Sequence, residues 1–355
     1  MTLGPRHIAT LGGVFITVLV ALSGYDIYRA YNTAIENTGR ELDTQAKIIA
    51  EQTARSLQAV DVLLRHLVQQ HNQRALARLN EPELHALLAD LAVGFGQIDG
   101  FVVIGADGRL RGASYIEVGK AAQVSVADVP TFNYLSSHRH EGVLVDTARL
   151  SNFDGRWLYP IARRLETPSG AFAGVVAARG RIDYFQDFYR DINMEPGTRT
   201  ALVHRNGTLL ARFPPAPEAL GKPLSGPAAL LATRSPDGPP LRTKSPIDGA
   251  DRIGVVKPVP DYPLVVVVTR DAQAVLAPWR AQSLRTGART LGLATIAVAL
   301  LVLLMRQFSR LLRTRESLAT TQERYALAVA GSDDGIWEYD FTTGRAFASA
   351  RAREL

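Results

Sequence analysis

Phe101–Gly112 has the sequence FVVIGADGRLRG, and Thr200–Ala211 has the sequence TALVHRNGTLLA. Each stretch consists of an apolar run, an Asp-Gly or Asn-Gly pair, and a second apolar run. Such pairs favour tight hairpin turns because both turn residues adopt a positive φ. The sequence therefore predicts one β-hairpin in each stretch, and it predicts that the same element occurs twice in the chain.

The elements that follow each hairpin also repeat in one order. A second turn signal comes next, Asp154-Gly155 in the first copy and Asp248-Gly249 in the second. Two apolar strands and a helix complete each copy: LYPIARRL, AFAGVVAA and RIDYFQDFYRDI, then IGVVKPV, PLVVVV and DAQAVLAPWRAQ. A repeat of this length predicts two similar sheet-and-helix modules in series, and hence an α+β fold. The alternative is one antiparallel fold with glycine turns at irregular intervals.

A long helix is predicted before the first module. The stretch from Ile27 to His71 contains no proline and a single glycine, Gly39. Its apolar residues follow one another at steps of three and four, which is typical of a coiled-coil seam: Ala50, Thr53, Leu57, Val60, Leu64 and Leu67. Such a seam fits a homodimer. Asn80, followed by Pro82, predicts the N-cap of a further helix.

Two apolar segments flank this block, Ile8–Tyr25 and Thr290–Met305. A helix needs about 20 apolar residues to cross the core of a bilayer. Both segments are therefore predicted to span a membrane, the second with the flanking Arg289 and Arg306 snorkelling to its surface. For the first segment the alternative is a cleaved signal peptide, because Ala21-Leu22-Ser23 resembles a small-residue cleavage site.

Arginines indicate the orientation of these spans. Four of them follow the second segment before the first acidic residue, and this density is typical of the cytoplasmic side: Arg306, Arg310, Arg313 and Arg315. Two spans then return the N-terminus to the cytoplasm. The block between them is predicted to be periplasmic, in a multi-pass protein embedded in the lipid of a bacterial inner membrane.

The composition excludes several classes of protein. The 355 residues include 40 Lys+Arg and 34 Asp+Glu, but no basic run with interleaved aromatics occurs, so nucleic acid is not expected as a partner. The absence of cysteine excludes disulfides and thiolate metal sites. No Walker, G-x-S-x-G or HExxH motif is present, so no catalytic residue and no cofactor is predicted. His138-Arg139-His140-Glu141 offers two metal ligands, yet a solvated loop is the preferred interpretation.

The ordered set of segments resembles the double Cache (PDC) sensor domains of bacterial transmembrane receptors. The resemblance covers about residues 27–285 and rests on DVPTFNYLSSHRHEGV, GRWLYPIARRL, GAFAGVVAARGRIDYFQDFY and ALVHRNGTLLARFP, in that order. It implies two tandem PAS-like modules behind a long helix. The expected division is a cytoplasmic N-terminus 1–7, a transmembrane helix 8–25, a periplasmic helix 26–79, a membrane-distal module 80–195, a membrane-proximal module 196–285, a transmembrane helix 286–306 and a signalling helix 307–323.

The last segment, 324–355, resembles the opening of a PAS domain. Asp334-Gly335 precedes a short strand in which Trp337, Tyr339 and Phe341 alternate with polar residues, and Thr343-Gly344 turns the chain back. The segment is too short to close a PAS core. A truncated PAS domain is therefore expected, with any enzymatic output beyond Leu355.

The resemblance implies that a small molecule binds in the membrane-distal module. On the strand Arg156–Arg164, alternation places Trp157, Tyr159 and Arg163 on one face. Two aromatic rings and a guanidinium suit an amphipathic pocket that holds an anionic group. The alternative is that Trp157 and Tyr159 are core residues and Arg163 is an exposed strand end.

Other candidate site residues come from the same resemblance. Asp128, Phe132 and Tyr134 lie on the segment that covers the pocket in the family. Arg179 stands where amino-acid-binding members carry an aspartate for the ligand ammonium, and a cation there repels an ammonium. The Arg-Trp-Tyr set of those members is also spaced differently here. The expected ligand is therefore a small carboxylate or another anion.

These expectations together describe a periplasmic sensor that passes ligand occupancy through the second span to a cytoplasmic output. The output expected from the resemblance is cyclic di-GMP turnover by a diguanylate cyclase or phosphodiesterase. The alternatives are the sensor portion of a histidine kinase and a membrane-tethered binding protein without signalling output.

Overall fold

The computed structural model describes residues 5–151, 154–192, 195–224, 240–331, 335–349 and 352–353. The chain divides into two compact units. One is Ala30–Arg280, and the other combines Met1–Arg29 with Ala281–Leu355. The larger unit carries both sheets of the predicted modules, so most of the functional argument concerns it.

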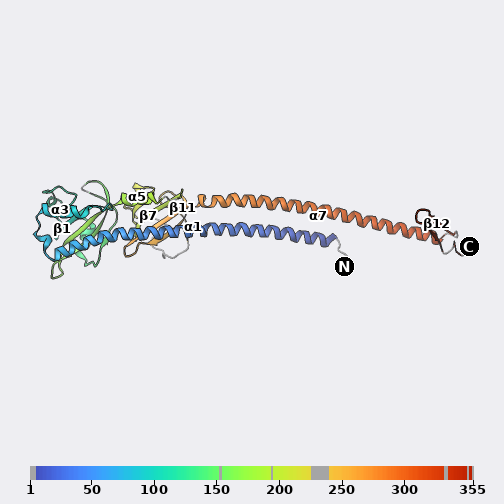
Figure 1. The fold of residues 1–355 in the computed structure, drawn as a ribbon, viewed down its shortest axis with the longest axis horizontal. Helices are drawn as coiled ribbons and strands as arrows, with labels where there is room; N and C mark the ends of the chain where they lie inside the picture. Colours follow the sequence, from blue (N-terminus) through green and yellow to red (C-terminus); the bar gives the residue numbers. More distant parts are fainter. Residues whose placement is uncertain are drawn as a thin grey trace. The chain divides into compact units, whose positions relative to one another are not determined.

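Helix α1 (Pro5–Asn72) joins the first predicted span and the predicted long helix into one uninterrupted element. Within the larger unit its apolar seam is buried, with Leu57, Val60, Leu64 and Leu67 each at most 1 % exposed. The seam packs on the sheets of its own chain, and Figure 1 shows α1 running past both of them. The interpretation of this stripe as a dimer seam was therefore wrong, although the helix itself is confirmed.

The first sheet follows α2 (Ala75–Arg78) and α3 (Glu81–Ala92). As predicted, Asn80 caps α3: its side chain accepts from the Glu83 amide at 2.9 Å, and the Glu83 carboxylate accepts from the Asn80 amide at 2.9 Å. The sheet has the order β2-β1-β6-β5-β3, with β4 also paired to β5. Its strands are β1 (Ile98–Gly105), β2 (Leu110–Ala113), β3 (Leu144–Val145), β4 (Arg149–Leu150), β5 (Trp157–Glu166) and β6 (Phe172–Arg181). The helical segments η1 (Ala121–Gln123), α4 (Pro130–Ser137) and α5 (Ile182–Asp191) complete this part.

The second sheet has the order β8-β7-β11-β10-β9, which matches the order β2-β1-β6-β5-β3 of the first sheet without its extra strand β4. Both predicted hairpins are confirmed, and their turn glycines Gly108 and Gly207 have φ values of +78° and +89°. These values explain why Asp-Gly and Asn-Gly occur there, since glycine adopts a positive φ without steric cost. The strands are β7 (Thr198–His204), β8 (Leu209–Phe213), β9 (Leu241–Lys244), β10 (Asp251–Pro258) and β11 (Leu264–Asp271), with η2 (Pro217–Ala219) between β8 and β9.

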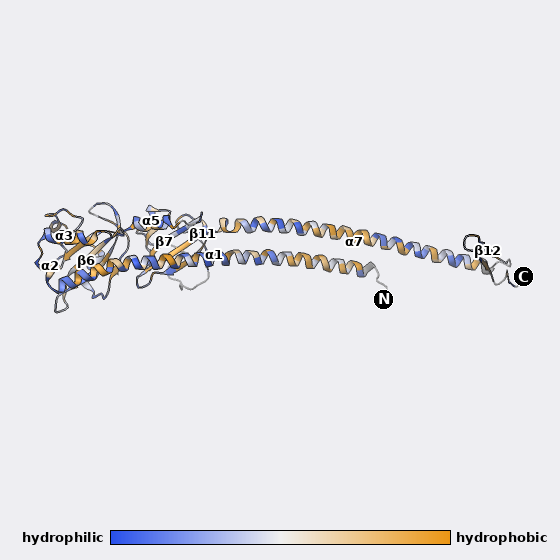
Figure 2. Cartoon of the chain, in the orientation of Figure 1, coloured by the Kyte–Doolittle hydropathy of each residue, from blue (hydrophilic) through white to orange (hydrophobic). Residues whose placement is uncertain are grey.

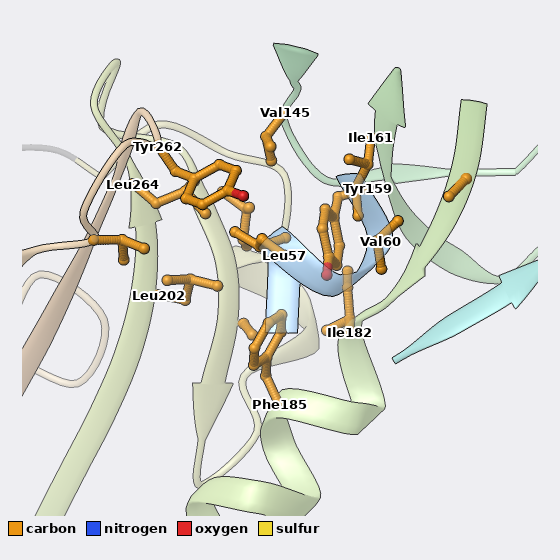
Figure 3. Close-up of a cluster of buried hydrophobic side chains, with 14 of the residues drawn as sticks. Leu57, Val60, Val145, Tyr159, Ile161, Ile182, Phe185, Leu202, Tyr262 and Leu264 are labelled. Atoms are coloured by element: carbon orange, nitrogen blue, oxygen red, sulfur yellow. The ribbon is translucent and has the colours of Figure 1, made fainter. Parts of the chain in front are cut away.

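One continuous apolar layer connects the two sheets through α1. Figure 3 shows Leu57 of α1 between Leu202 of the second sheet and Tyr159 of the first, with Val60 on the other side of the Tyr159 ring. A second, separate cluster lies on the other face of the first sheet, beneath α4: it includes Val102, Ile104, Leu110, Phe132, Leu135 and Ala162. The first sheet is thus covered on both faces, and each face buries its own set of side chains.

The smaller unit contains the two apolar helical segments. By length and composition, α1 and α7 (Ala272–Gly331) are both able to cross a membrane, and their apolar windows are not buried within the protein. Figure 2 shows the middle of α7 mainly in orange, with hydrophilic residues on either side. Ser23 and Thr290, one in each segment, share a hydrogen bond of 2.7 Å between their hydroxyl oxygens.

The last described element is a hairpin of β12 (Trp337–Asp340) and β13 (Arg345–Ala348). The predicted turn at Thr343-Gly344 is confirmed, because the Gly344 amide donates to the Asp340 carbonyl at 2.8 Å. Asp334 of the preceding predicted turn lies outside the described residues. Trp337 and Phe341 are 74 % and 92 % exposed, so this hairpin buries little apolar surface by itself.

Candidate functional site

The first sheet bears a cavity of about 360 Å³ on the face opposite α1. This volume lies within the range of about 300–1,000 Å³ that small-molecule sites occupy. Its walls come from β1, β2, β5, β6, the chain around η1, and α4. The lining residues are Val102, Ile104, Leu110, Tyr115, Ile116, Val124, Ser125, Val126, Val129, Thr131, Phe132, Arg149, Leu150, Ser151, Leu158, Pro160, Ala162, Val175, Ala177, Ala178 and Arg179.

Most of this wall is aliphatic or aromatic because it is formed by one face of the sheet. On β5 the residues that line the cavity are Leu158, Pro160 and Ala162, which alternate with residues that point toward α1. Phe132 of α4 faces the sheet, and its ring makes an edge contact with Phe172 at 5.6 Å between centroids. The cavity can therefore accept an apolar group of a ligand.

Arg179 brings a positive charge to this apolar wall. It lies on β6 and is 7 % exposed. One terminal nitrogen donates to Asp154 Oδ2 at 2.6 Å and lies 3.4 Å from Asp99 Oδ2, while the guanidinium stacks 4.2 Å from the ring centre of Tyr115. Its Nε is buried and has no hydrogen-bond partner among the described residues. Arg179 is thus held in place with one donor still available.

Arg149 is the second guanidinium at the cavity. It donates to the hydroxyl of Thr131 and lies 3.9 Å from Asp146 Oδ2. The Thr131 hydroxyl in turn donates to Asp146, so the three side chains form a connected polar group. Burial lowers the pKa of Arg149, but a guanidinium stays charged in proteins. Among the described residues that line the cavity, the two arginines are charged and none is acidic.

The neighbouring groups have defined protonation states. Burial raises the pKa of Tyr115 to about 12, so its phenol stays neutral at physiological pH. Burial also acts to raise the pKa of Asp154, but hydrogen bonds from Ser151, Arg179 and Arg156 outweigh it and hold that pKa well below its usual range. Asp154 therefore remains ionised and accepts a hydrogen bond from one terminal nitrogen of Arg179. Because the guanidinium is planar, this bond also restricts the direction of the Nε–H group.

A pH-dependent contribution to stability follows from Asp154. Its pKa is lower in the folded than in the unfolded chain, so its contribution is present above about pH 4 and is lost as the pH falls through the folded-state pKa. We expect Asp154→Asn to lower the free energy of unfolding by about 1–3 kcal/mol at pH 7 and by clearly less at pH 3. Urea unfolding at both pH values measures this difference. Asp191→Asn, at a carboxylate that is 72 % exposed, is the control, and an equal loss at both pH values for Asp154→Asn would contradict the assignment.

The structure brings only some of the predicted site residues together. Phe132 and Arg179 both line the cavity. Asp128 and Tyr134 lie on the segment around α4 but are exposed, and Tyr134 stacks on His138 at 4.9 Å between ring centroids. The predicted covering segment is therefore present, and within it Phe132 is the predicted residue that reaches the cavity.

Trp157, Tyr159 and Arg163 lie on the opposite face of β5, contrary to the prediction. Tyr159 is fully buried against α1, as Figure 3 shows beside Val60. Arg163 donates to both carboxylate oxygens of Asp61 on α1, at 2.5 and 3.0 Å. Trp157 packs against Gly221, where an added Cβ would lie 2.8 Å from its Cζ3 atom. Alternation predicted correctly that the three share a face, but it does not indicate which face of a two-sided strand meets the ligand.

Sequence reasoning missed Arg149, Tyr115 and Thr131. Arg149 belongs to a strand of two residues, and Tyr115 lies in the chain that follows β2, so neither stands in a periodic pattern. Both residues belong to the long connection between β2 and β5, and the course of this connection brings them to the cavity. The only sequence signal near them is the Asp154-Gly155 turn, which positions the carboxylate that holds Arg179.

Solved structures of similar fold are extracellular or ligand-binding domains of receptors. The extracellular domain of rpHK1S-Z16, a protein assigned as a histidine kinase, is 29 % identical with a TM-score of 0.60, and the match covers 68 % of this chain and 98 % of that one. The ligand-binding domain of the Pseudomonas aeruginosa PAO1 amino acid chemoreceptor PctB, in complex with L-Arg, is 18 % identical with a TM-score of 0.53 and coverages of 68 % and 98 %. That of the Pseudomonas fluorescens chemoreceptor CtaA, with L-serine, is 15 % identical with a TM-score of 0.51 and coverages of 66 % and 98 %.

No curated protein matches the sequence. The family model of the Cache domain does match, over residues 30–279. This range includes the part of α1 that packs on the sheets, both sheets, and the cavity with Arg149 and Arg179. It also agrees with the extent of the larger compact unit, Ala30–Arg280. The chain therefore belongs to the Cache-domain family, as a double Cache sensor domain between two candidate membrane spans.

Proposed function

We propose that the chain is the sensing part of a bacterial inner-membrane receptor, and that its periplasmic domain binds a small carboxylate with an apolar tail. Occupancy would pass along α7 to a cytoplasmic output. The observation that carries this proposal is the cavity wall, which presents Arg149 and Arg179 on a mainly apolar surface. We further propose that the two sheets are tandem PAS-like modules, membrane-distal and membrane-proximal, because they share one strand order.

The polar end of the ligand is argued from hydrogen-bond donors. Arg179 Nε is buried without a partner among the described residues, and an unsatisfied buried donor costs roughly 1–3 kcal/mol, or more when it is charged. A carboxylate oxygen satisfies such a donor with a charge-assisted bond. Arg149 lines the same cavity and adds a second positive charge. The site is therefore complementary to an anion.

The remainder of the ligand is argued from the aliphatic wall. Burial of one Leu-sized apolar group contributes roughly 1.5–3 kcal/mol. An α-ammonium group, in contrast, would meet two guanidiniums and no carboxylate among the described residues that line the cavity. Burying such a cation without a partner is costly. An aliphatic monocarboxylate therefore fits better than an amino acid, even though CtaA and PctB share this fold.

A ligand-dependent unfolding experiment tests the proposal. The full chain in detergent is heated with hexanoate, hexylamine or leucine at equal ionic strength. Saturation at about 100 times Kd adds about 2.7 kcal/mol, which corresponds to a rise in Tm of roughly 5–10 °C for a domain of this size. We expect this rise with hexanoate. Arg179→Gln should weaken hexanoate binding by roughly tenfold or more, because a charge-assisted bond is lost.

Arg181→Gln is the matched control. Arg181 lies two residues further on the same strand, pairs with Asp183 and does not line this cavity. It should leave the response to hexanoate unchanged. Equal protection by hexylamine or leucine, or an unchanged response in Arg179→Gln, would refute the carboxylate assignment.

The output is proposed to be cyclic di-GMP turnover through a PAS domain that begins at about residue 324. A histidine kinase output is the second candidate, and the 29 % identity to the extracellular domain of rpHK1S-Z16 favours it. Any sequence following Leu355 in the gene discriminates between them, through a GGDEF-type loop or a phosphoacceptor histidine. We also propose a homodimer, with surfaces other than the buried seam of α1 in contact.

A further inference from the structure

The second sheet carries a smaller cavity of about 60 Å³ that neither the family nor the proposed function explains. Three arginines from three different strands line it: Arg199 of β7, Arg212 of β8 and Arg252 of β10. Arg212 and Arg252 are only 8 % and 5 % exposed. Like charges at short range repel one another strongly in a protein interior. A cavity of this size that is lined by three guanidiniums therefore needs negative charge nearby.

Asp248 supplies part of this negative charge. Asp248 Oδ2 accepts from Arg252 at 2.7 Å and from Arg212 at 3.4 Å. Burial opposes its ionisation, but hydrogen bonds from Ser245 and Arg252 outweigh this and keep the pKa of Asp248 well below its usual range. Burial lowers the pKa of Arg212, and the nearby charges that act on it are Asp248, Arg252 and Arg199. Among the described residues, Asp248 therefore pairs with two of the three arginines that line this cavity.

A buried donor also remains without a partner at this cavity. Arg252 uses its terminal nitrogens for Asp248 and for the Gly197 carbonyl, at 2.7 and 3.4 Å. Its Nε is buried and has no hydrogen-bond partner within the described part of the chain. Since a native structure rarely leaves a buried charged donor unpaired, this atom marks a place for an acceptor that the described residues do not provide.

A similar turn lies beside the cavity of the first sheet. Ser151-x-x-Asp154-Gly155 and Ser245-x-x-Asp248-Gly249 form equivalent turns, in which the glycine amide donates to the serine carbonyl at 2.9 and 2.8 Å. In each turn the aspartate holds a buried arginine whose Nε has no partner among the described residues, Arg179 or Arg252. The turn and its carboxylate thus occur in both sheets, whereas the arginine comes from β6 in the first sheet and from β10, the counterpart of β5, in the second.

We propose that the second sheet contains a separate binding site for a small anion, at most the size of acetate, held by Arg252, Arg212 and Arg199. One water needs roughly 10–15 Å³ of cavity, so 60 Å³ accepts about four to six water-sized groups. That is enough for acetate, formate or nitrate and too little for a ligand with an extended tail. Thr269 lines the same cavity and provides a hydroxyl donor.

The test compares sodium acetate with sodium gluconate, a much larger carboxylate, at equal ionic strength. Tm is measured for the full chain in detergent, for Arg199→Gln, and for Arg179→Gln as the control at the first-sheet cavity. We expect acetate to raise Tm in the wild type and in Arg179→Gln alike. Arg199→Gln, at a side chain that is only half-buried, should need roughly tenfold more acetate for the same rise.

Asp248→Asn should lower the acetate concentration needed for a given rise in Tm, whereas Arg199→Gln should raise it. Asp248→Asn removes the carboxylate that Arg212 and Arg252 share, so Tm should fall in gluconate and recover in acetate at lower concentration than the wild type requires. The proposal is overturned if acetate has no effect on Tm, or if Asp248→Asn is not rescued. It is also overturned if Arg179→Gln loses the effect while Arg199→Gln keeps it, because acetate would then bind at the first sheet.

Discussion

Asp61→Asn is expected to lower the free energy of unfolding by about 3 kcal/mol, since removing one partner of a buried ion pair leaves the other charge uncompensated. Asp61 lies on α1, and its side chain is 9 % exposed. It accepts two hydrogen bonds from Arg163 of β5, at 2.5 and 3.0 Å, and a further contact from Arg65 at 3.3 Å. Urea unfolding of the full chain in detergent, followed by tryptophan fluorescence, measures the loss.

The exposed pair between Arg181 and Asp183 is the control. Their side chains are 40 % and 58 % exposed, so Asp183→Asn should cost at most about 1 kcal/mol. The double substitution Asp61→Leu with Arg163→Met should recover most of the lost stability, because apolar side chains of similar volume often replace a buried pair at little cost. A loss for Asp61→Asn no larger than that for Asp183→Asn would show that the pair does not fasten α1 to the sheet.

This ion pair also bears on ligand sensing. Arg163 faces α1, whereas its neighbour Ala162 lines the cavity on the other face of β5. A ligand that shifts β5 therefore shifts the strand that is joined to α1 by this ion pair. A change on one face can reach the other directly, because a packed strand moves as a unit.

The sequence predicted well those features that local chemistry determines. Both hairpins follow from Asp107-Gly108 and Asn206-Gly207, because a tight turn needs a positive φ at specific positions. The start of α3 follows from Asn80 and Pro82, because an N-cap depends on neighbouring residues only, and the structure adds the reciprocal bonds between Asn80 and Glu83. The matching order of elements then predicted two sheets with matching topology, which the strand pairing bears out.

Features that depend on tertiary neighbours were predicted less well. The pattern of Trp157, Tyr159 and Arg163 indicates one face of a strand, but both faces of β5 are covered, and periodicity does not name the covering element. Arg179 was found because the family resemblance expects a ligand-binding aspartate at this position, just after an apolar strand. Arg149 reaches the cavity only through a long connection, so its role depends on contacts distant in the sequence.

The neighbour of the apolar seam on α1 was also not readable from its periodicity. Leu64→Ala tests whether this seam belongs to the core of the domain rather than to a dimer contact. Leu64 is completely buried in the layer that α1 forms with the sheets, so its truncation should lower the free energy of unfolding by about 2–5 kcal/mol. Val62, on the same helix and 51 % exposed, is the matched control, and Val62→Ala should change stability by at most about 0.5 kcal/mol. Urea midpoints measured over a hundredfold range of protein concentration check both expectations.

The concentration series separates the two interpretations of the seam. A core residue stabilises the folded monomer, so the effect of Leu64→Ala should be the same at every protein concentration. A residue in a dimer contact would instead contribute through association, and its effect would change with protein concentration by mass action. If the loss caused by Leu64→Ala depends on concentration, or equals that of Val62→Ala, the seam is not the core of this domain, and the packing of both sheets on α1 must be abandoned.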